Sequence, residues 1–165
     1  MRKSTLACLM IVILIFSFGC KKDKSATTPE TTSSLSVKYD GTTWTSSAVS
    51  AIYTSQMDIT AIIAMNSTAT QQVHVTFIGD STGTFNCTND TFENTLAVML
   101  GVGAGDSYLT WMADANGTLG QIIVTKYDKI NNKISGTFHF DGYNEDGTKK
   151  VFTEGKFTNI NCTRN

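Results

Sequence analysis

The sequence predicts an all-β fold in which antiparallel strands form a meander that closes into a barrel or a sandwich. Threonine makes up 26 of the 165 residues, and together with valine, isoleucine and aromatic residues it favours strands. Apolar runs alternate with short clusters of Gly, Asn and Asp, and no window of twelve residues has a helical period. Because about eleven strands in one flat sheet would expose the core face, we expect closure, with a lipocalin-like barrel as one form.

The expected strands are separated by recognisable turns. In chain order the strands are 35–39, 42–46, 48–54, 57–66, 72–78, 83–88, 95–102, 107–113, 119–127, 132–143 and 148–158. Asp40-Gly41, Asn116-Gly117 and Asp146-Gly147 suit two-residue hairpin turns, because both positions of each pair accept positive φ. Longer hairpin loops are expected at 79–83 and 103–106, and such short connections join antiparallel neighbours.

Side-chain alternation supports individual strands. Segment 57–66 is apolar on both faces, which predicts a strand that is buried on both sides. In 72–78, 95–102 and 132–143, apolar residues recur at every second position, so each of these strands has one core face. Gly136 leaves room for an aromatic ring of a neighbouring strand to lie over the backbone.

The N-terminus has the parts of an export signal. Met1-Arg2-Lys3 is basic, residues 6–18 are almost wholly apolar, and Gly19 precedes Cys20. The apolar run is too short to span a ~30 Å hydrocarbon core comfortably, but it fits a signal peptide. The segment resembles a bacterial lipobox, in which a diacylglyceryl group is attached to the cysteine and cleavage follows just before it. Ser17 stands where leucine is common, as in the looser lipoboxes of Bacteroidetes. Ordinary secretory cleavage, which would leave a free cysteine, is the alternative.

We therefore expect a lipoprotein signal peptide over 1–19, and lipidation at Cys20. Residues 20–34, which carry three lysines and then a Ser/Thr-rich stretch, are expected to form a flexible tether, and 35–165 a single all-β domain. The expected location is the bacterial cell envelope, with the protein lipid-anchored in the outer membrane and facing either the periplasm or the cell surface.

Four short strings resemble a family of small Bacteroidetes lipoproteins of unknown function. The strings are Tyr39-Asp-Gly-Thr-Thr-Trp-Thr45, Gly120-Gln-Ile-Ile-Val-Thr-Lys-Tyr-Asp128, Lys133-Ile-Ser-Gly-Thr-Phe-His-Phe140 and Gly155-Lys-Phe-Thr-Asn-Ile160. In that family a strand, a short turn and an Ile-Ser-Gly-Thr-Phe strand precede the closing strand. The resemblance implies an all-β exported domain and no known activity.

Few residues form a pattern that suggests chemistry. The sequence has no His-Glu-x-x-His, paired Cys-x-x-Cys or Gly-x-Ser-x-Gly string. His139 and Asp141 share one strand face and could pair at a metal site, with His74 as the other histidine, but exposed polar residues are the simpler interpretation. Asp90 with Glu93 is a weak candidate for a glycosidase carboxylate pair. We therefore expect no enzyme activity, no metal and no cofactor.

Three further groups of residues are weaker candidates for a functional site. The acidic turn 141–146 lacks the calcium-loop spacing and is better interpreted as a polar hairpin tip. Asp80-Ser81-Thr82 is similar to the short O-glycosylation string of Bacteroidetes. Six aromatic residues could line a sugar or lipid site or simply pack the core: Trp44, Trp111, Tyr53, Tyr108, Tyr127 and Tyr143.

The expected function is that of an envelope-anchored, non-catalytic binding or interaction module. The alternative is a lipocalin-like carrier with a hollow interior that holds a small apolar ligand. The expected partners are the membrane, through the lipid on Cys20, and a protein, a glycan or a small apolar ligand. The formal net charge of −1 argues against nucleic acid.

The cysteine count predicts one disulfide. Cys8 leaves with the signal peptide and Cys20 carries lipid, so Cys87 and Cys162 remain. In an oxidising envelope an even remainder usually pairs, and the bridge would staple a C-terminus lying just past the last strand to the sheet. Two unpaired thiols are the alternative.

Overall fold

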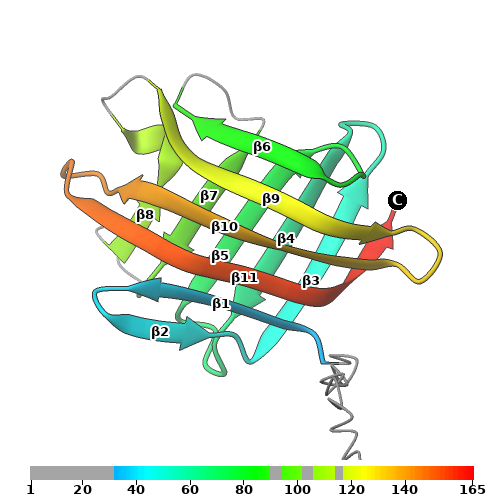
Figure 1. Cartoon of the computed structure of the whole chain (residues 1–165). Coiled ribbons are helices and arrows are strands. Elements are labelled where there is room, and N and C mark those ends of the chain that lie inside the picture. The colour runs from blue at the N-terminus through cyan, green and yellow to red at the C-terminus, as the bar shows by residue number, and fades with distance from the viewer. Residues whose placement is uncertain (1–31, 90–93, 102–105, 114–116) are drawn as a thin grey trace, which may run out of the picture.

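The all-β prediction is confirmed by a computed structural model, which describes residues 32–89, 94–101, 106–113 and 117–165 (Figure 1). Within these residues eleven strands belong to one mostly antiparallel sheet. The strands are β1 (Ser34–Tyr39), β2 (Thr42–Thr45), β3 (Ala48–Thr54), β4 (Ile59–Met65), β5 (Gln72–Ile78), β6 (Gly83–Thr88), β7 (Thr95–Met99), β8 (Ser107–Leu109), β9 (Thr118–Asp128), β10 (Lys133–Tyr143) and β11 (Lys149–Arg164). A short 3-10 turn, Thr110–Met112, follows β8.

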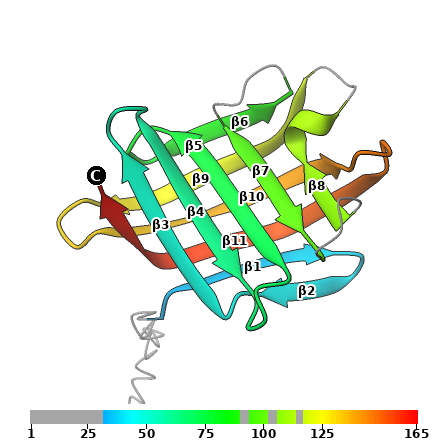
Figure 2. The same cartoon turned by 180° about the vertical axis from the view of Figure 1, so that it is seen from behind.

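The sheet is folded over into two layers that cross each other (Figures 1 and 2). The front layer of Figure 1 contains β2, β1, β11, β10, β9 and β6, and the back layer contains β3, β4, β5, β7 and β8. At one end, residues 162–164 of β11 pair in parallel with residues 51–53 of β3. At the other end the layers are joined by the single pair Tyr143–Leu109. The result is a folded sheet rather than a clean barrel.

Two β-bulges bend β11 so that it serves both layers. Its register with β10 shifts twice, and the extra residues, Glu154 and Asn159, have φ angles of 52° and 48°. The amide of Asn159 donates a 2.8 Å hydrogen bond to Ser135 Oγ, which gives this bulge a partner on β10. Glu154 forms a 3.0 Å ion pair with Lys38 on β1.

The strand order departs from a simple meander. Strand β5 pairs with β7, whereas β6 crosses to the front layer and pairs with β9, so the expected 79–83 hairpin is wrong.

Asp40-Gly41 does form a two-residue turn with φ angles of 48° and 76°. Between β10 and β11 the connection spans 144–148, longer than the two-residue turn predicted at Asp146-Gly147. Asn144 Oδ1 accepts hydrogen bonds from the amides of Asp146 and Thr148 and thereby organises this longer loop.

Strand β4 is buried on one face only, which corrects the prediction that both of its faces are covered. Thr60, Ile62 and Ala64 point into the core and are fully buried. The intervening residues form the outer face of the back layer, where Ile63 is 36% exposed. The registers Ile62–Val75 and Ala64–Val73 put these β4 residues beside the core face of β5, so the alternate residues of β4 lie on the opposite, outer face.

The space between the layers is filled by aromatic rings. The rings of Phe140 and Phe152 stack with centroids 4.4 Å apart, and both side chains are buried. As predicted, an aromatic ring lies over Gly136: a Cβ there would sit 2.5 Å from Cζ of Phe157. A Cβ at Gly155 would likewise sit 2.6 Å from the Phe138 ring. Side chains at these two positions are therefore excluded by close packing.

The end at which β11 meets β3 is held by Arg164. Its guanidinium forms a 2.5 Å ion pair with Asp80 and lies 4.6 Å from the centre of the Tyr53 ring. Lys129 also reaches Asp80, at 2.7 Å. These contacts link β11, the β5–β6 turn and the β9–β10 turn. The hydrogen bonds from Lys129 and Arg164 lower the pKa of the Asp80 carboxyl.

Gly136→Ala should destabilise the fold by about 1–3 kcal/mol, because its Cβ would clash with the backbone carbonyl oxygen of Ile123 and with the Phe157 ring. The measurement is the free energy of unfolding from urea titration. Gly83→Ala is the matched control, since its Cβ would lie 3.3 Å from the end of the Phe85 ring, a contact that a small ring shift relieves. Equal losses in the two variants would contradict this account of the core.

Asp80→Asn should reduce the acid sensitivity of the fold. Because the carboxyl pKa is lower in the folded than in the unfolded chain, Asp80 stabilises the fold fully above its ordinary pKa of about 4. That contribution, on the order of 0.2–1 kcal/mol for such a pair, is lost as pH falls through the folded-state value. Urea unfolding between pH 6 and pH 2 tests this, with Asp146→Asn as an exposed control. A wild-type pH profile in Asp80→Asn would refute it.

Candidate functional site

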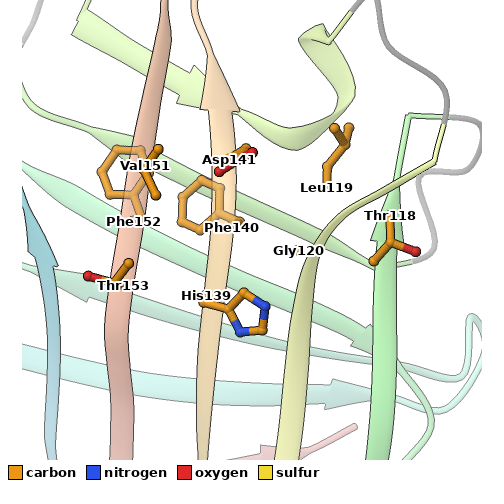
Figure 3. Close-up of a pocket in the computed structure, with 9 residues that line it drawn as sticks. All are labelled: Thr118, Leu119, Gly120, His139, Phe140, Asp141, Val151, Phe152 and Thr153. Carbon is orange, nitrogen blue, oxygen red and sulfur yellow. The ribbon is translucent and has the colours of Figure 1, made fainter.

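A shallow hollow of about 300 Å³ lies on the outer face of the front layer (Figure 3). Strand alternation builds it: His139 and Asp141 of β10 and Val151 and Thr153 of β11 point outward, while the phenylalanines between them point into the core. Thr118 and Leu119 of β9 complete one side. His139 and Asp141 therefore share the outer face of β10, as the alternation predicts, and Val151 is opposite Asp141 on β11.

The polar groups of this hollow suit hydrogen bonding to a ligand. Lys149 forms a 2.6 Å ion pair with Asp141, and the hydrogen bond to that carboxylate raises the pKa of Lys149. His139 and Thr153 are exposed beside this pair. The site thus offers an imidazole, an ion pair and a hydroxyl on an open surface. Such a set can bind a polar ligand by surface contacts.

The second histidine lies on the opposite side of the molecule. His74, on β5, belongs to the outer face of the back layer and is hydrogen-bonded to Gln72 at 3.0 Å. Desolvation by burial lowers the pKa of His74. The two histidines therefore do not meet at a common metal site. Across the described segments, no group of three or more His, Cys, Asp or Glu side chains is arranged to hold a metal ion.

A second hollow, of about 320 Å³, lies on the outer face of the back layer. It is lined by Ser50, Ala51, Ile52, Ala61, Ile63 and Thr163. Strands β3, β4, β5 and β7 contain no Asp, Glu, Lys or Arg, so this face is uncharged. Sequence reasoning missed the surface because it assigned both faces of 57–66 to the interior. The signal was present in the apolar residues at 59, 61, 63 and 65.

The six aromatic candidates are not gathered into one site. Trp44 is buried and donates a 3.0 Å hydrogen bond to Gln71 Oε1. Tyr53 and Tyr127 flank Arg164 at one end of the molecule. At the other end Tyr143 pairs with Leu109, next to Tyr108, and Trp111 belongs to the 3-10 turn there. Burial raises the pKa of Tyr127 to about 12, and its hydroxyl lies 3.1 Å from Thr60 Oγ1, so it is engaged inside the fold.

Several other candidates lie in turns or outside the description. Ser81 and Thr82 are exposed on the β5–β6 turn, next to the ion-paired Asp80. In the acidic turn, Asn144 uses its carbonyl oxygen to hold backbone amides. Cys20, the signal peptide, and the Asp90 and Glu93 pair fall outside the described residues.

The predicted disulfide between Cys87 and Cys162 is absent, and both cysteines are buried free thiols. Cys162 is not past the last strand but within β11, opposite Ala51 of β3. Cys87 and Phe140 are both paired with Gly120 of β9, so Cys87 lies at the level of Phe140 along the front layer. Cys162 lies at the level of Asn132 instead, because its amide donates a hydrogen bond to the Asn132 carbonyl. Eight residues along a strand correspond to about 26 Å, far beyond the ~7 Å Cα separation that a disulfide spans.

The fold defines a β domain whose candidate sites lie on its surface. Two crossed layers enclose a packed aromatic interior, and the hollows described above open on the outer faces. Residues 31–161 match the model of the family described as Domain of unknown function (DUF6252), and the chain belongs to this family. Comparisons with curated proteins and with solved structures returned no match. Within the described segments no helix is both long enough and apolar enough to cross a membrane.

The two thiols should be unreactive in the folded protein and free after unfolding. Burial raises the pKa of Cys87 to about 12, so almost no thiolate exists at neutral pH. Peptide mapping without reductant should therefore find Cys87 and Cys162 alkylated only when the alkylating reagent is added in denaturant. A cross-linked Cys87–Cys162 peptide would contradict the separation of the two strands.

Proposed function

We propose that this protein is a lipid-anchored lipoprotein of the bacterial outer membrane whose β domain is a non-catalytic binding module. The anchor proposal rests on the order of basic residues, apolar run, Gly19 and Cys20 at the N-terminus. The module proposal rests mainly on one structural observation: the interior is packed, and the hollows lie on outer faces.

Packing supports surface binding over the carrier alternative. A carrier needs an apolar ligand to occupy the space between the layers. Here stacked Phe140 and Phe152 lie in that space, and Gly136 and Gly155 are in contact with rings at distances that admit no Cβ. The second apolar face of β4, which was expected to be buried, is directed away from the interior.

The chemistry of the polar hollow supports binding without catalysis. The Asp141 carboxylate is engaged by Lys149, and the neighbouring side chains are hydroxyl, imidazole and aliphatic groups on an open surface. General acid–base catalysis usually depends on groups held near a substrate with water restricted. An exposed protein segment or glycan is the kind of partner that such a surface accommodates.

The anchor is tested by Cys20→Ser in cells of the native organism. The variant should leave the detergent phase of a Triton X-114 partition and appear in the aqueous phase, because it lacks the acyl chains that hold the protein in the bilayer. Ser17→Ala is the matched control, since it changes a neighbouring residue without removing the lipidated sulfur. Retention of Cys20→Ser in the detergent phase would refute the anchor.

A further inference from the structure

The most exposed large apolar side chain of the described residues is Ile130, at the tip of the β9–β10 turn. It is 91% exposed, while Met57, in the β3–β4 turn, is 63% exposed. A β-branched residue is unusual at a hairpin tip, where Gly, Asn, Asp and Pro dominate. Neither side chain contributes to the core, so the fold does not account for their apolar character.

The turn presents Ile130 in a defined way. Asp128 Oδ1 accepts hydrogen bonds from the amides of Ile130 and Asn131, and the Asn131 side chain donates a 2.8 Å bond to the other Asp128 oxygen. Asn132 then takes a φ of 52°, which turns the chain into β10. These hydrogen bonds fix the backbone of the turn, with Ile130 at its tip.

The turns that carry Ile130 and Met57 lie at the same end of the molecule. Lys129 is bound to Asp80 at 2.7 Å, and the amide of Gly79 in the same β5–β6 turn donates a 2.6 Å hydrogen bond to the carbonyl of Asp58. Both views show the β3–β4 turn, the β9–β10 turn and the C-terminus together at this end (Figures 1 and 2). The two exposed apolar side chains thus belong to one surface.

The chain enters the fold near the base of the β9–β10 hairpin, on the side of the molecule opposite the β3–β4 turn. Ser33 Oγ donates a 2.8 Å hydrogen bond to the carbonyl of Asn159, and Lys133, at the base of the β9–β10 hairpin, reaches the same oxygen at 3.4 Å. Cys20 precedes Ser33 by 13 residues, a length that spans at most about 45 Å when fully extended. A lipid on Cys20 would therefore keep the domain, including the β9–β10 hairpin, within reach of the bilayer.

We propose that the end carrying Ile130 and Met57 contacts the membrane, with both side chains entering the headgroup region of the bilayer. This inference rests on the proposed lipid anchor. The contact depends on the two apolar side chains, because the lysines around the tip already have partners: Lys126 pairs with Asp128, Lys129 with Asp80, and Lys133 donates a hydrogen bond to Asn161. These pairs also neutralise the Asp80 and Asp128 carboxylates next to the tip. Because the anchor keeps the local bilayer concentration high, a weak contact is sufficient.

The test uses the full lipidated chain with a single reporter at the tip. Ile130→Cys is labelled with a polarity-sensitive fluorophore, NBD, and reconstituted into vesicles of phosphatidylethanolamine and phosphatidylglycerol. Val151→Cys, which is 49% exposed in the wild type and lies on the front face, is the matched control. The native thiols are buried, and wild-type protein treated with the same label gives the blank. We expect a shift of the emission to shorter wavelength at position 130 and a water-like spectrum at 151.

The possible outcomes separate the two proposals. If the protein floats with the vesicles but position 130 gives the same spectrum as 151, the membrane contact is wrong and the anchor stands. If the wild-type protein does not float with the vesicles and lacks a lipid by mass spectrometry, the anchor fails first. A shift at 130 in native envelopes but not in protein-free vesicles would overturn the membrane contact in favour of a protein partner.

Discussion

Both layers depend on β11, which has to pair with strands that run in different directions. It is joined to β10 along one edge, and to β1 and then β3 along the other. A regular strand of 16 residues would not reach all of them, and the bulges at Glu154 and Asn159 supply the bends. The aromatic packing over Gly136 and Gly155 lies on the same stretch of β10 and β11, so the strand that joins the two layers also carries part of the core.

Because aromatic rings fill the interior, a ligand would have to bind at the outer surface. Strand alternation gives β10 and β11 one apolar face for the core and one mixed face for solvent, and the polar hollow at His139 and Asp141 belongs to the second. The back layer differs, because its outer face is uncharged and carries isoleucine side chains. The molecule therefore presents two chemically distinct faces, and an end with its own exposed apolar tip.

Strand positions were predictable because they depend on local information. Each segment carries its own turn residues and two-residue period, and nine of the predicted segments match a strand to within about three residues at each end. One exception is 107–113, where the strand ends at Leu109 and a 3-10 turn continues the segment. The other is 148–158, because β11 continues to Arg164 and therefore contains Cys162. The face shared by His139 and Asp141 was predictable for the same reason.

The sequence by itself determined the strand content, the core face of most strands and the need for glycine beneath a ring at Gly136. Only the tertiary structure decided which strands are neighbours: β6 with β9, β11 in parallel with β3, and the outer position of one face of β4. Pairing between distant segments depends on which apolar faces are brought together, and the same two-residue pattern is compatible with many partners. That choice placed Cys87 and Cys162 far apart and put the point where the chain enters the fold beside the base of the β9–β10 hairpin.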